Sequence, residues 1–535
     1  MNTTITRMMA GALALAASLA CPNGSIDAAS RAVCAAELSP ELLRKVEQDP
    51  HVVACRKSRE ALAGSPYRPL YHMSAPDKLI HDPNGLCQWQ GRYHLFYQYK
   101  QPGPGWLIHW GHAYSDDLLH WKDLPVAIKP TIEGSCFSGT TLVEKDRVIA
   151  MYHGTGRGNM IATASDPLLL DWEKHPDNPV IPKGNTQGPY AVYDPCIWKE
   201  KDGYYYTLTR GRKAREVHIL RSKDLTDWKW LGPMFVDEKF AATNEDISCP
   251  YFWPVGKGKH LLLCFSHGRA GQGYLGTFDL GKARFTADHH FRANYGPWMH
   301  GSIHAPSATI DDKGRYLAIY NMKEQRGITH KGWDGVMTLP LVYSLAEDDS
   351  LRVEPAEEVE KLRFDHKQLG GRPIPDGEEV PLPEIAGKAM EIQAVLKPGT
   401  AKEVGLKVLQ WTDPHEHLES PDQSEYTAIR FDKEKSTLSI DPLKSSLLRI
   451  PPRTPETGPL ELEEGEPIQL RIFIDRSIVE VFANGRLFLG VRAYPTNEDA
   501  RGVSLFSTGG DAELVSLQAW HMRSVWPELR AKEGK

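Results

Sequence analysis

Short runs of aliphatic, aromatic and β-branched residues alternate with turns of glycine and polar residues over the first 350 residues, and five of these runs resemble one another. They are GRYHLFYQY from Gly91, DRVIAMYHG from Asp146, GYYYTLTRG from Gly203, GKHLLLCFS from Gly258 and GRYLAIYNM from Gly314, with starts 55, 57, 55 and 56 residues apart. Each run follows a turn and is too short for a helix, which is typical of a strand. Five units of this length, each with room for four short strands, predict a five-bladed β-propeller.

A second repeated segment supports the propeller. SDDLLHW ends at Trp121, SDPLLLDW at Trp172 and SKDLTDW at Trp228, and each follows one of the first three runs at a similar distance. Two independent series with the same period indicate repetition of a structural unit.

The repeat brings acidic residues together. The positions nine residues before the five runs are Asp82, Phe137, Asp194, Cys249 and Ala305. The innermost strand of every propeller blade lines a central channel, so these positions should converge at one mouth of it. Glu245 and Asp246 lie just before the fourth position. Asp82-Pro83-Asn84-Gly85 alone would be an ordinary turn, but three acidic sites at one mouth repel one another and therefore indicate function.

The pattern changes after the propeller, which we place at 68–350. Residues 351–388 are rich in charge, Pro and Gly and predict a linker. Strand-like runs return over 389–535, in AMEIQAVL, SEYTAIRFD, STLSIDP, IQLRIFIDRSIVEVFANG and VSLFSTGG. Their alternation predicts an antiparallel β-sandwich, and Asn484-Gly485 is a strong signal for a hairpin. The predicted fold class is all-β, a five-bladed propeller followed by a C-terminal β-sandwich.

Composition argues against some partners. The chain has 535 residues, with 63 basic and 69 acidic side chains and a net charge of -6. A nucleic-acid partner would require a basic surface, so we predict none. The 8 cysteines form no CxxC pair, and the 21 histidines show no convincing ligand spacing. We therefore predict no metal and no cofactor.

The N-terminus resembles an export signal. Residues 1–20 contain one basic residue, Arg7, followed by an apolar stretch too short for an ordinary transmembrane helix. Cleavage after Ala20 would leave an N-terminal extension over 21–67, and Cys21 could alternatively carry a lipid anchor. Cys34 and Cys55 could form a disulfide in an oxidising compartment. We expect an exported protein, periplasmic, extracellular or anchored at the cell surface, without a transmembrane segment.

Several motifs together resemble glycoside hydrolase family 32, the invertase, inulinase and levanase group. They are HDPNG, YHLFYQY, HWGHAYSDDLLHW, CFSGT, YDPCIW, GWDGVMTLP and DRSIVEVFANGR, and the resemblance covers roughly residues 68 to 525. It implies a propeller joined to a sandwich. It also implies hydrolysis of terminal β-D-fructofuranosidic bonds in sucrose, inulin or levan with retention of configuration.

The resemblance also implies residue roles. Asp82 would be the nucleophile, Asp194 the stabiliser that binds fructose hydroxyls, and Glu245 the acid/base. The substrate pocket would be shaped by Asn84, Gln98, Trp106, Phe137, Ser138 and Trp333, with His81 and Tyr193 beside the two aspartates. In a retaining enzyme the nucleophile and the acid/base lie about 5 to 5.5 Å apart.

Three residues depart from the family pattern. His81 stands where the family usually has Asn, Tyr193 where it has Arg, and Ser248 where it has the acid/base Glu before Cys-Pro. Glu245 and Asp246 are adjacent, so on an extended strand only one can face the sugar. We favour Glu245 because its side chain is longer, with Asp246 as the alternative. A fructan-binding propeller with an eroded active site and a fructosyltransferase remain alternative functions.

Overall fold

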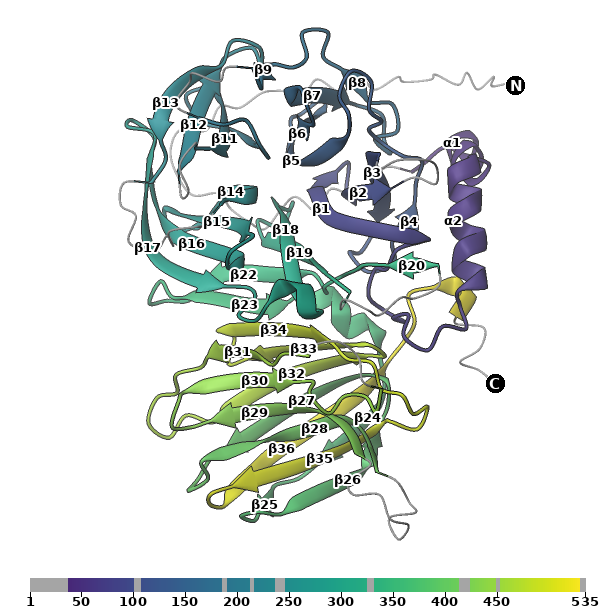
Figure 1. Cartoon of the computed structure of the whole chain (residues 1–535), viewed down its shortest axis with the longest axis vertical. Helices are drawn as coiled ribbons and strands as arrows, with labels where there is room; N and C mark the ends of the chain where they lie inside the picture. Colours follow the sequence, from purple (N-terminus) through teal and green to yellow (C-terminus); the bar gives the residue numbers. More distant parts are fainter. Residues whose placement is uncertain are drawn as a thin grey trace, which may run out of the picture.

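The computed structural model describes residues 37–100, 107–184, 190–211, 216–235, 246–324, 332–412, 424–448 and 453–529. Figure 1 shows two bodies, a ring of small sheets built from the first part of the chain and two larger stacked sheets built from the rest. The prediction of a five-bladed propeller followed by a β-sandwich is confirmed.

Each blade is built around four antiparallel strands taken in chain order. Blade one contains β1 (Lys78–Trp89), β2 (Arg92–Lys100), β3 (Ile108–Ser115) and β4 (Lys122–Asp123). Blade two contains β5 (Cys136–Val143), β6 (Val148–Gly154), β7 (Gly158–Ala164) and β8 (Glu173–Lys174), with β9 (Ile181–Pro182) beside β7. Blade three contains β10 (Cys196–Lys199), β11 (Tyr205–Arg210), β12 (Val217–Ser222) and β13 (Lys229–Pro233).

Blade four contains β14 (Ser248–Gly256), β15 (Lys259–Ser266), β16 (Ala270–Asp279) and β17 (Arg284–Arg292). Blade five contains β18 (Ile303–Ile310), β19 (Tyr316–Met322), β22 (Leu341–Leu345) and β23 (Leu351–Pro355), with β21 (Val336–Met337) beside β19. A short 3-10 helix, η1 (Trp298–His300), precedes blade five.

The first strands of the blades, β1, β5, β10, β14 and β18, contact one another in ring order. The five sequence runs are the second strands, β2, β6, β11, β15 and β19. The positions nine residues earlier therefore fall on the innermost strands, or just before one in the case of Asp194, as predicted. The ring closes where β20 (Trp333–Asp334) pairs in parallel with the start of β1.

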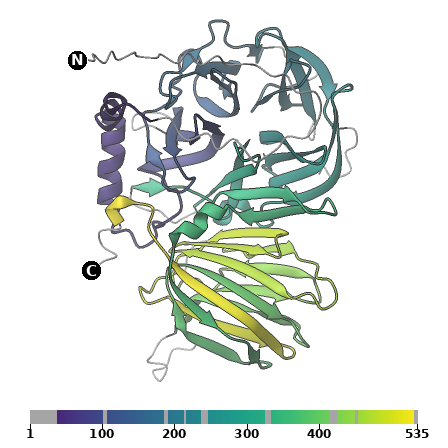
Figure 2. The same ribbon diagram turned by 180° about the vertical axis from the view of Figure 1, so that it is seen from behind.

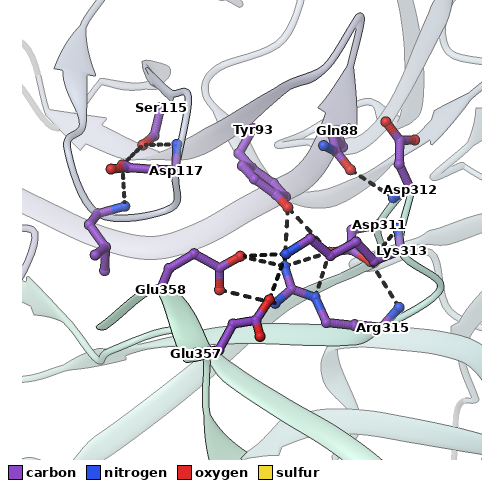
Figure 3. Close-up of polar contacts among 11 residues, drawn as sticks. Gln88, Tyr93, Ser115, Asp117, Asp311, Asp312, Lys313, Arg315, Glu357 and Glu358 are labelled. Carbon is purple, nitrogen blue, oxygen red and sulfur yellow. Dashed lines mark hydrogen bonds and ion pairs between the residues drawn. The ribbon is translucent and has the colours of Figure 1, made fainter. Parts of the chain in front are cut away.

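The second repeated segment is a turn that a carboxylate holds in shape. Leu118, Leu169 and Leu225 occupy equivalent places in it and all have positive φ, of 66°, 51° and 72°. An L-residue rarely adopts this conformation without support. Support comes from an Asp one to three residues earlier. Asp117, for example, accepts hydrogen bonds from the backbone N–H of Leu119 and His120. It also accepts one from Ser115 Oγ (Figure 3).

A buried ion network joins blade five to blade one. The Arg315 guanidinium donates to Asp311 at 2.8 Å, to both oxygens of Glu358 at 3.0 Å and to the Tyr93 hydroxyl at 3.2 Å (Figure 3). Asp311 and Glu358 are buried, and a buried carboxylate requires a partner of opposite charge. Because Glu358 lies on the 3-10 helix η2 (Glu357–Leu362), the network also anchors the chain as it leaves the propeller.

The sandwich has two antiparallel sheets, seen from behind in Figure 2. The first contains β24 (Arg363–Leu369), β36 (Ala512–Met522), β27 (Ala389–Lys397), β32 (Ile468–Asp475), β33 (Ile478–Ala483) and β34 (Leu487–Arg492), with β25 (Arg372–Ile374) on β36. The second contains β26 (Glu379–Ala386), β35 (Gly502–Thr508), β28 (Glu403–Thr412), β29 (Ser424–Asp432), β30 (Thr437–Asp441) and β31 (Glu456–Pro459). Asn484 and Gly485, both with positive φ, turn the predicted hairpin between β33 and β34.

The prediction of a linker over 351–388 is wrong for most of that segment. It forms β23 of the propeller, η2, and then β24, β25 and β26 of the sandwich. Its charged residues misled the prediction because these strands lie at sheet edges, where one face remains in solvent. The side chains of Asp365, His366 and Lys367, for example, are exposed.

Two helices precede the propeller, α1 (Pro40–Glu47) and α2 (Pro50–Ala61). Ser39 and Asp49 cap their N-termini through side-chain oxygens, and each helix has Pro in its first turn. Arg59 of α2 is buried, pairs with Asp123 of β4 at 2.6 Å and lies 4.1 Å over the Trp526 ring. The expected signal segment 1–20, Cys21 and Cys34 lie outside the described residues, so the predicted disulfide of Cys55 is not tested. No helix among the described residues is long and apolar enough to span a membrane.

Asp475 of β32 joins the two bodies. Its carboxylate accepts hydrogen bonds from the backbone N–H groups of Leu70, Tyr71 and His72 at 2.6, 2.8 and 3.0 Å. The His72 ring places Nδ1 2.8 Å from Asp475 and Nε2 3.5 Å from Glu480. Burial alone would lower the pKa of His72, but Glu480 and Asp475 raise it from 6.5 to about 9. The protonated ring therefore holds the entry to the propeller against the sandwich.

The pKa of His72 predicts a pH-dependent free energy of unfolding. A group whose pKa is raised by folding stabilises the fold fully below its unfolded pKa and loses that effect as pH rises through the folded value. At pH 7 we expect His72→Gln to lower the free energy of unfolding by about 3 kcal/mol, because it leaves buried carboxylates without a cation. The difference from wild type should shrink above pH 9, as measured by urea unfolding at a series of pH values.

The control for this experiment is His289→Gln, which changes an exposed histidine of β17. It should alter the free energy of unfolding by less than about 0.5 kcal/mol at every pH. A His72→Gln deficit that stays constant from pH 6.5 to 9.5 would contradict a protonated His72.

Candidate active site

A cavity of about 580 Å³ opens at one mouth of the propeller channel, and every blade contributes to it. Its lining residues are His81, Asp82, Gln98, Phe137, Ser138, His153, Tyr193, Asp194, Arg210, Asp246, Ser248, Cys249, Phe265, His267, His304 and Lys323. Three carboxylates from blades one, three and four therefore meet in one space, as the sequence repeat predicts.

Asp82 lies on β1 and is surrounded by donors from other strands. Its Oδ2 accepts hydrogen bonds from Gln98 Nε2 at 3.1 Å and from Ser138 Oγ at 3.0 Å. Its Oδ1 lies 3.2 Å from Nδ1 of His304, on β18. These contacts fix the orientation of the carboxylate.

Basic groups keep Asp82 ionised. Burial would raise its pKa, but the imidazoles of His304 and His81 and the charge on Lys323 hold that pKa well below its usual value. Burial and the nearby ammonium lower the pKa of His304 to about 4, so this ring is neutral at pH 7. Lys323, which is half-buried, donates to the ring nitrogens of His81, 3.1 Å from Nε2. An oriented, ionised and partly desolvated carboxylate is suited to nucleophilic attack.

Asp194 approaches Asp82 across Cys249. Asp194 Oδ2 accepts a hydrogen bond from the Cys249 backbone N–H at 3.1 Å. The Cys249 thiol lies 3.6 Å from Asp82 Oδ2 and 3.7 Å from Asp194 Oδ2. Cys249 has a positive φ of 48°, which turns its N–H toward the cavity. Burial and the two carboxylates raise the pKa of this thiol, so it stays neutral and does not add a third negative charge.

Asp246 is held by groups of blade four. Its Oδ2 accepts from Ser248 Oγ at 2.8 Å and lies 2.7 Å from Nδ1 of His267, and its Oδ1 accepts from the His267 backbone N–H at 2.8 Å. Burial would raise the pKa of Asp246, but the His267 contacts and the Ser248 hydroxyl lower it to about 2. Asp246 is therefore ionised near neutral pH.

The predicted substrate residues divide into three groups. His81, Gln98, Phe137, Ser138 and Tyr193 line the cavity. Two do not line it. Asn84 is fully buried in β1, and Trp333 is buried on β20, with the guanidinium groups of Arg68 and Arg492 within 5.9 and 5.6 Å of its ring. Trp106 and the predicted acid/base Glu245 lie outside the described residues.

Several cavity residues escaped sequence reasoning, although the repeat contained a signal for them. The eighth positions of the five runs are Gln98, His153, Arg210, Phe265 and Asn321. Four of them line the cavity, and Asn321 contacts His304 at 3.2 Å. The second strand of each blade runs antiparallel to the first, so its end reaches the same mouth as the start of the first strand. Arg210 is the least expected of them. Its guanidinium lies 5.3 Å over the ring of Tyr193, the residue that stands where the family has Arg.

Comparison with known proteins identifies the family. The model of the glycosyl hydrolases family 32 N-terminal domain matches residues 72–355, and that of the family 32 C-terminal domain matches residues 350–521. The chain belongs to glycosyl hydrolase family 32. It is a glycosidase of this family.

The relatives of this family 32 chain include a levanase of Bacillus subtilis, 27% identical over 501 residues, which span 86% of this chain and 71% of the levanase. A fructan 6-exohydrolase of Beta vulgaris is 27% identical over 542 residues, which span 86% of this chain and 87% of that enzyme. The structure of fructan 1-exohydrolase IIa from Cichorium intybus superposes with a TM-score of 0.74 at 24% identity, over 86% of this chain and 98% of that one. That likeness shows the fold.

Proposed function

We propose that this family 32 glycosidase hydrolyses terminal β-D-fructofuranosidic bonds in sucrose or in fructans such as inulin and levan, with retention of configuration. The observation that carries the proposal is the ionised Asp82, oriented by donors in a cavity that Asp194 shares. The names of the relatives, levanase, fructan exohydrolase and β-fructofuranosidase, agree with this substrate class.

In this mechanism Asp82 attacks the anomeric carbon of the fructosyl unit and forms a covalent intermediate, which water then hydrolyses. Asp194 accepts hydrogen bonds from sugar hydroxyls, and these bonds strengthen as the ring gains oxocarbenium character. Gln98 and Ser138 hold Asp82 in line for attack. Glu245 stays the sequence-based prediction for the acid/base, and Asp246 its alternative.

Export is part of the proposal. Residues 1–20 have the pattern of a signal peptide, and Cys21 offers a site for a lipid anchor.

A substrate panel tests the proposed function. The purified protein is incubated with sucrose, inulin, levan and an aryl β-D-fructofuranoside, and products are sized by chromatography. Free fructose from the chain end is expected. Longer fructans formed at high sucrose would identify a transferase, and binding without any product would identify a fructan-binding protein. With methanol as acceptor, the expected product is methyl β-D-fructofuranoside, because two displacements retain configuration.

Asp82→Asn should reduce kcat by about three orders of magnitude or more, because the amide cannot form the covalent intermediate. The amide keeps the volume of the carboxylate, so the thermal unfolding midpoint should change little. Asp227→Asn is the matched control, since the Asp227 side chain is 73% exposed, and it should keep wild-type kcat. An Asp82→Asn variant with more than a tenth of wild-type activity would exclude Asp82 as the nucleophile.

Lys323→Met should move the acid limb of the pH profile of kcat/KM to higher pH. Asp82 must be ionised to attack, so activity is lost as pH falls through its depressed pKa, and loss of the ammonium raises that pKa. Lys323→Arg keeps the charge and should leave the limb near its wild-type position. An acid limb unchanged in Lys323→Met would show that the ammonium does not act on the nucleophile.

Arg210→Met should raise KM for the fructoside about tenfold. Arg210 adds a cation to the cavity beside Tyr193, and Tyr193 is the residue that stands where the family has Arg. A guanidinium can donate paired hydrogen bonds to neighbouring hydroxyls of the sugar. The double variant Tyr193→Arg with Arg210→Met places the guanidinium at position 193 instead of 210, and it should recover much of the affinity for the fructoside. Equal KM values for wild type and Arg210→Met would contradict substrate binding by Arg210.

A further inference from the structure

We propose that His267 is the catalytic residue that gives a proton to the departing sugar and later takes one from water, with Asp246 as its positioning residue. The inference rests on the proposed β-fructosidase function and deepens it. It assigns the proton transfer to a histidine of the turn between β15 and β16, where sequence comparison suggested only carboxylates.

The first support is the way Asp246 holds the imidazole. One carboxylate oxygen accepts the His267 backbone N–H at 2.8 Å and the other lies 2.7 Å from Nδ1. Ser248 Oγ, at 2.8 Å, fixes the same carboxylate from the other side. Because Asp246 is ionised, Nδ1 is the nitrogen that carries a proton toward it, and we assign the proton transfer to Nε2. This is the arrangement in which an aspartate orients a histidine acid/base.

The second support is the place of the ring. His267 lines the same cavity as Asp82 and Asp194, and its side chain is 65% exposed. Ser248, which holds the family position of the acid/base, pairs with Phe265 in the register of β14 and β15. His267 follows Phe265 by two residues, in the turn after β15, and its Nδ1 shares Asp246 Oδ2 with the Ser248 hydroxyl.

The third support is electrostatic. The groups that face His267 among the described residues are Asp246, Ser248 and the edge-on ring of Phe265 at 5.1 Å, with the charges of Asp82 and Asp194 further off. The hydrogen bond to Asp246 raises the pKa of His267 above 6.5, and burial opposes this only in part. A proton donor works best when its pKa lies near the operating pH. Asp246 itself, with its pKa at about 2, carries no proton to give.

The reaction balances in two steps. In the first, a carboxylate oxygen of Asp82 bonds to the anomeric carbon while the bond from that carbon to the leaving oxygen breaks, and the leaving oxygen takes the proton from Nε2. In the second, neutral Nε2 takes a proton from water as the water oxygen bonds to the anomeric carbon and the ester bond to Asp82 breaks. Asp246 keeps its negative charge and its hydrogen bond to Nδ1 throughout.

Leaving-group dependence tests the proposal. His267→Asn should lower kcat/KM for sucrose about a hundredfold or more, the usual loss for a general acid. It should lower kcat/KM for an aryl β-D-fructofuranoside less than tenfold, because a phenolate leaves without protonation. Azide should then accelerate aryl fructoside turnover and yield fructosyl azide, since this anion attacks without a base. His289→Asn, on the exposed face of β17 in the same blade, should behave as wild type.

The pH profile tests the role of Asp246. Activity should fall at high pH as His267 loses its proton, and Asp246→Asn should move this alkaline limb to lower pH by about one unit, because the hydrogen bond to a carboxylate is lost. A merely structural Asp246 would change kcat without moving the limb. Glu245→Gln should show neither leaving-group selectivity nor azide rescue.

Three outcomes would overturn the proposal. The first is a His267→Asn variant that retains more than a tenth of wild-type activity on sucrose. The second is an equal loss on sucrose and on the aryl fructoside. The third is leaving-group selectivity with azide rescue in Glu245→Gln instead. Each requires an active wild-type enzyme. If wild type cleaves neither sucrose, inulin, levan nor the aryl fructoside, the proposed function itself has failed, so the two failures are distinguishable.

Discussion

Water solvates a carboxylate far better than a protein interior does, and Asp82 has to remain ionised where five blades exclude most of the solvent. The compensation comes from neighbouring donors and cations, and these come from different blades. Gln98 belongs to blade one, Ser138 to blade two, and His304 and Lys323 to blade five. A single blade could not supply them, so the charge depends on a closed ring. The pairing of β20 with β1 and the network around Arg315 hold the ring closed, and they thereby keep these donors and cations near Asp82.

The cavity differs from the family pattern in a consistent way. Tyr193 and Ser248 stand at or just before innermost strands, where the family has the charged residues Arg and Glu. The charged or ionisable groups next to them, Arg210 and His267, come from the second strands or the turns that follow. The start of the first strand and the end of the second strand lie at the same mouth. A functional side chain can therefore be supplied by either strand without a change of fold. The family motifs that we compared contain neither position, so the comparison did not find Arg210 and His267.

The sequence predicted the propeller because its repeat is periodic in both spacing and composition, and it predicted the sandwich because strands of that domain alternate clearly. It also placed Asp82, Asp194 and Asp246 at one mouth. It failed for 351–388, where edge strands have the composition of a loop. It could not show that two arginines lie near the Trp333 ring, or that the charge on Lys323 acts on Asp82. Those contacts depend on side-chain directions and on packing between distant segments, which periodicity does not encode.

The contact between Asp475 and the backbone of residues 70–72 spans about three quarters of the chain. During synthesis the segment that leads into the first blade emerges from the ribosome long before its partner exists. Until β32 has been translated, the three backbone N–H groups and the His72 ring have no contact with Asp475 and stay hydrated. The blades can therefore assemble early, but the segment that leads into them gains its partner only when β32 has been made.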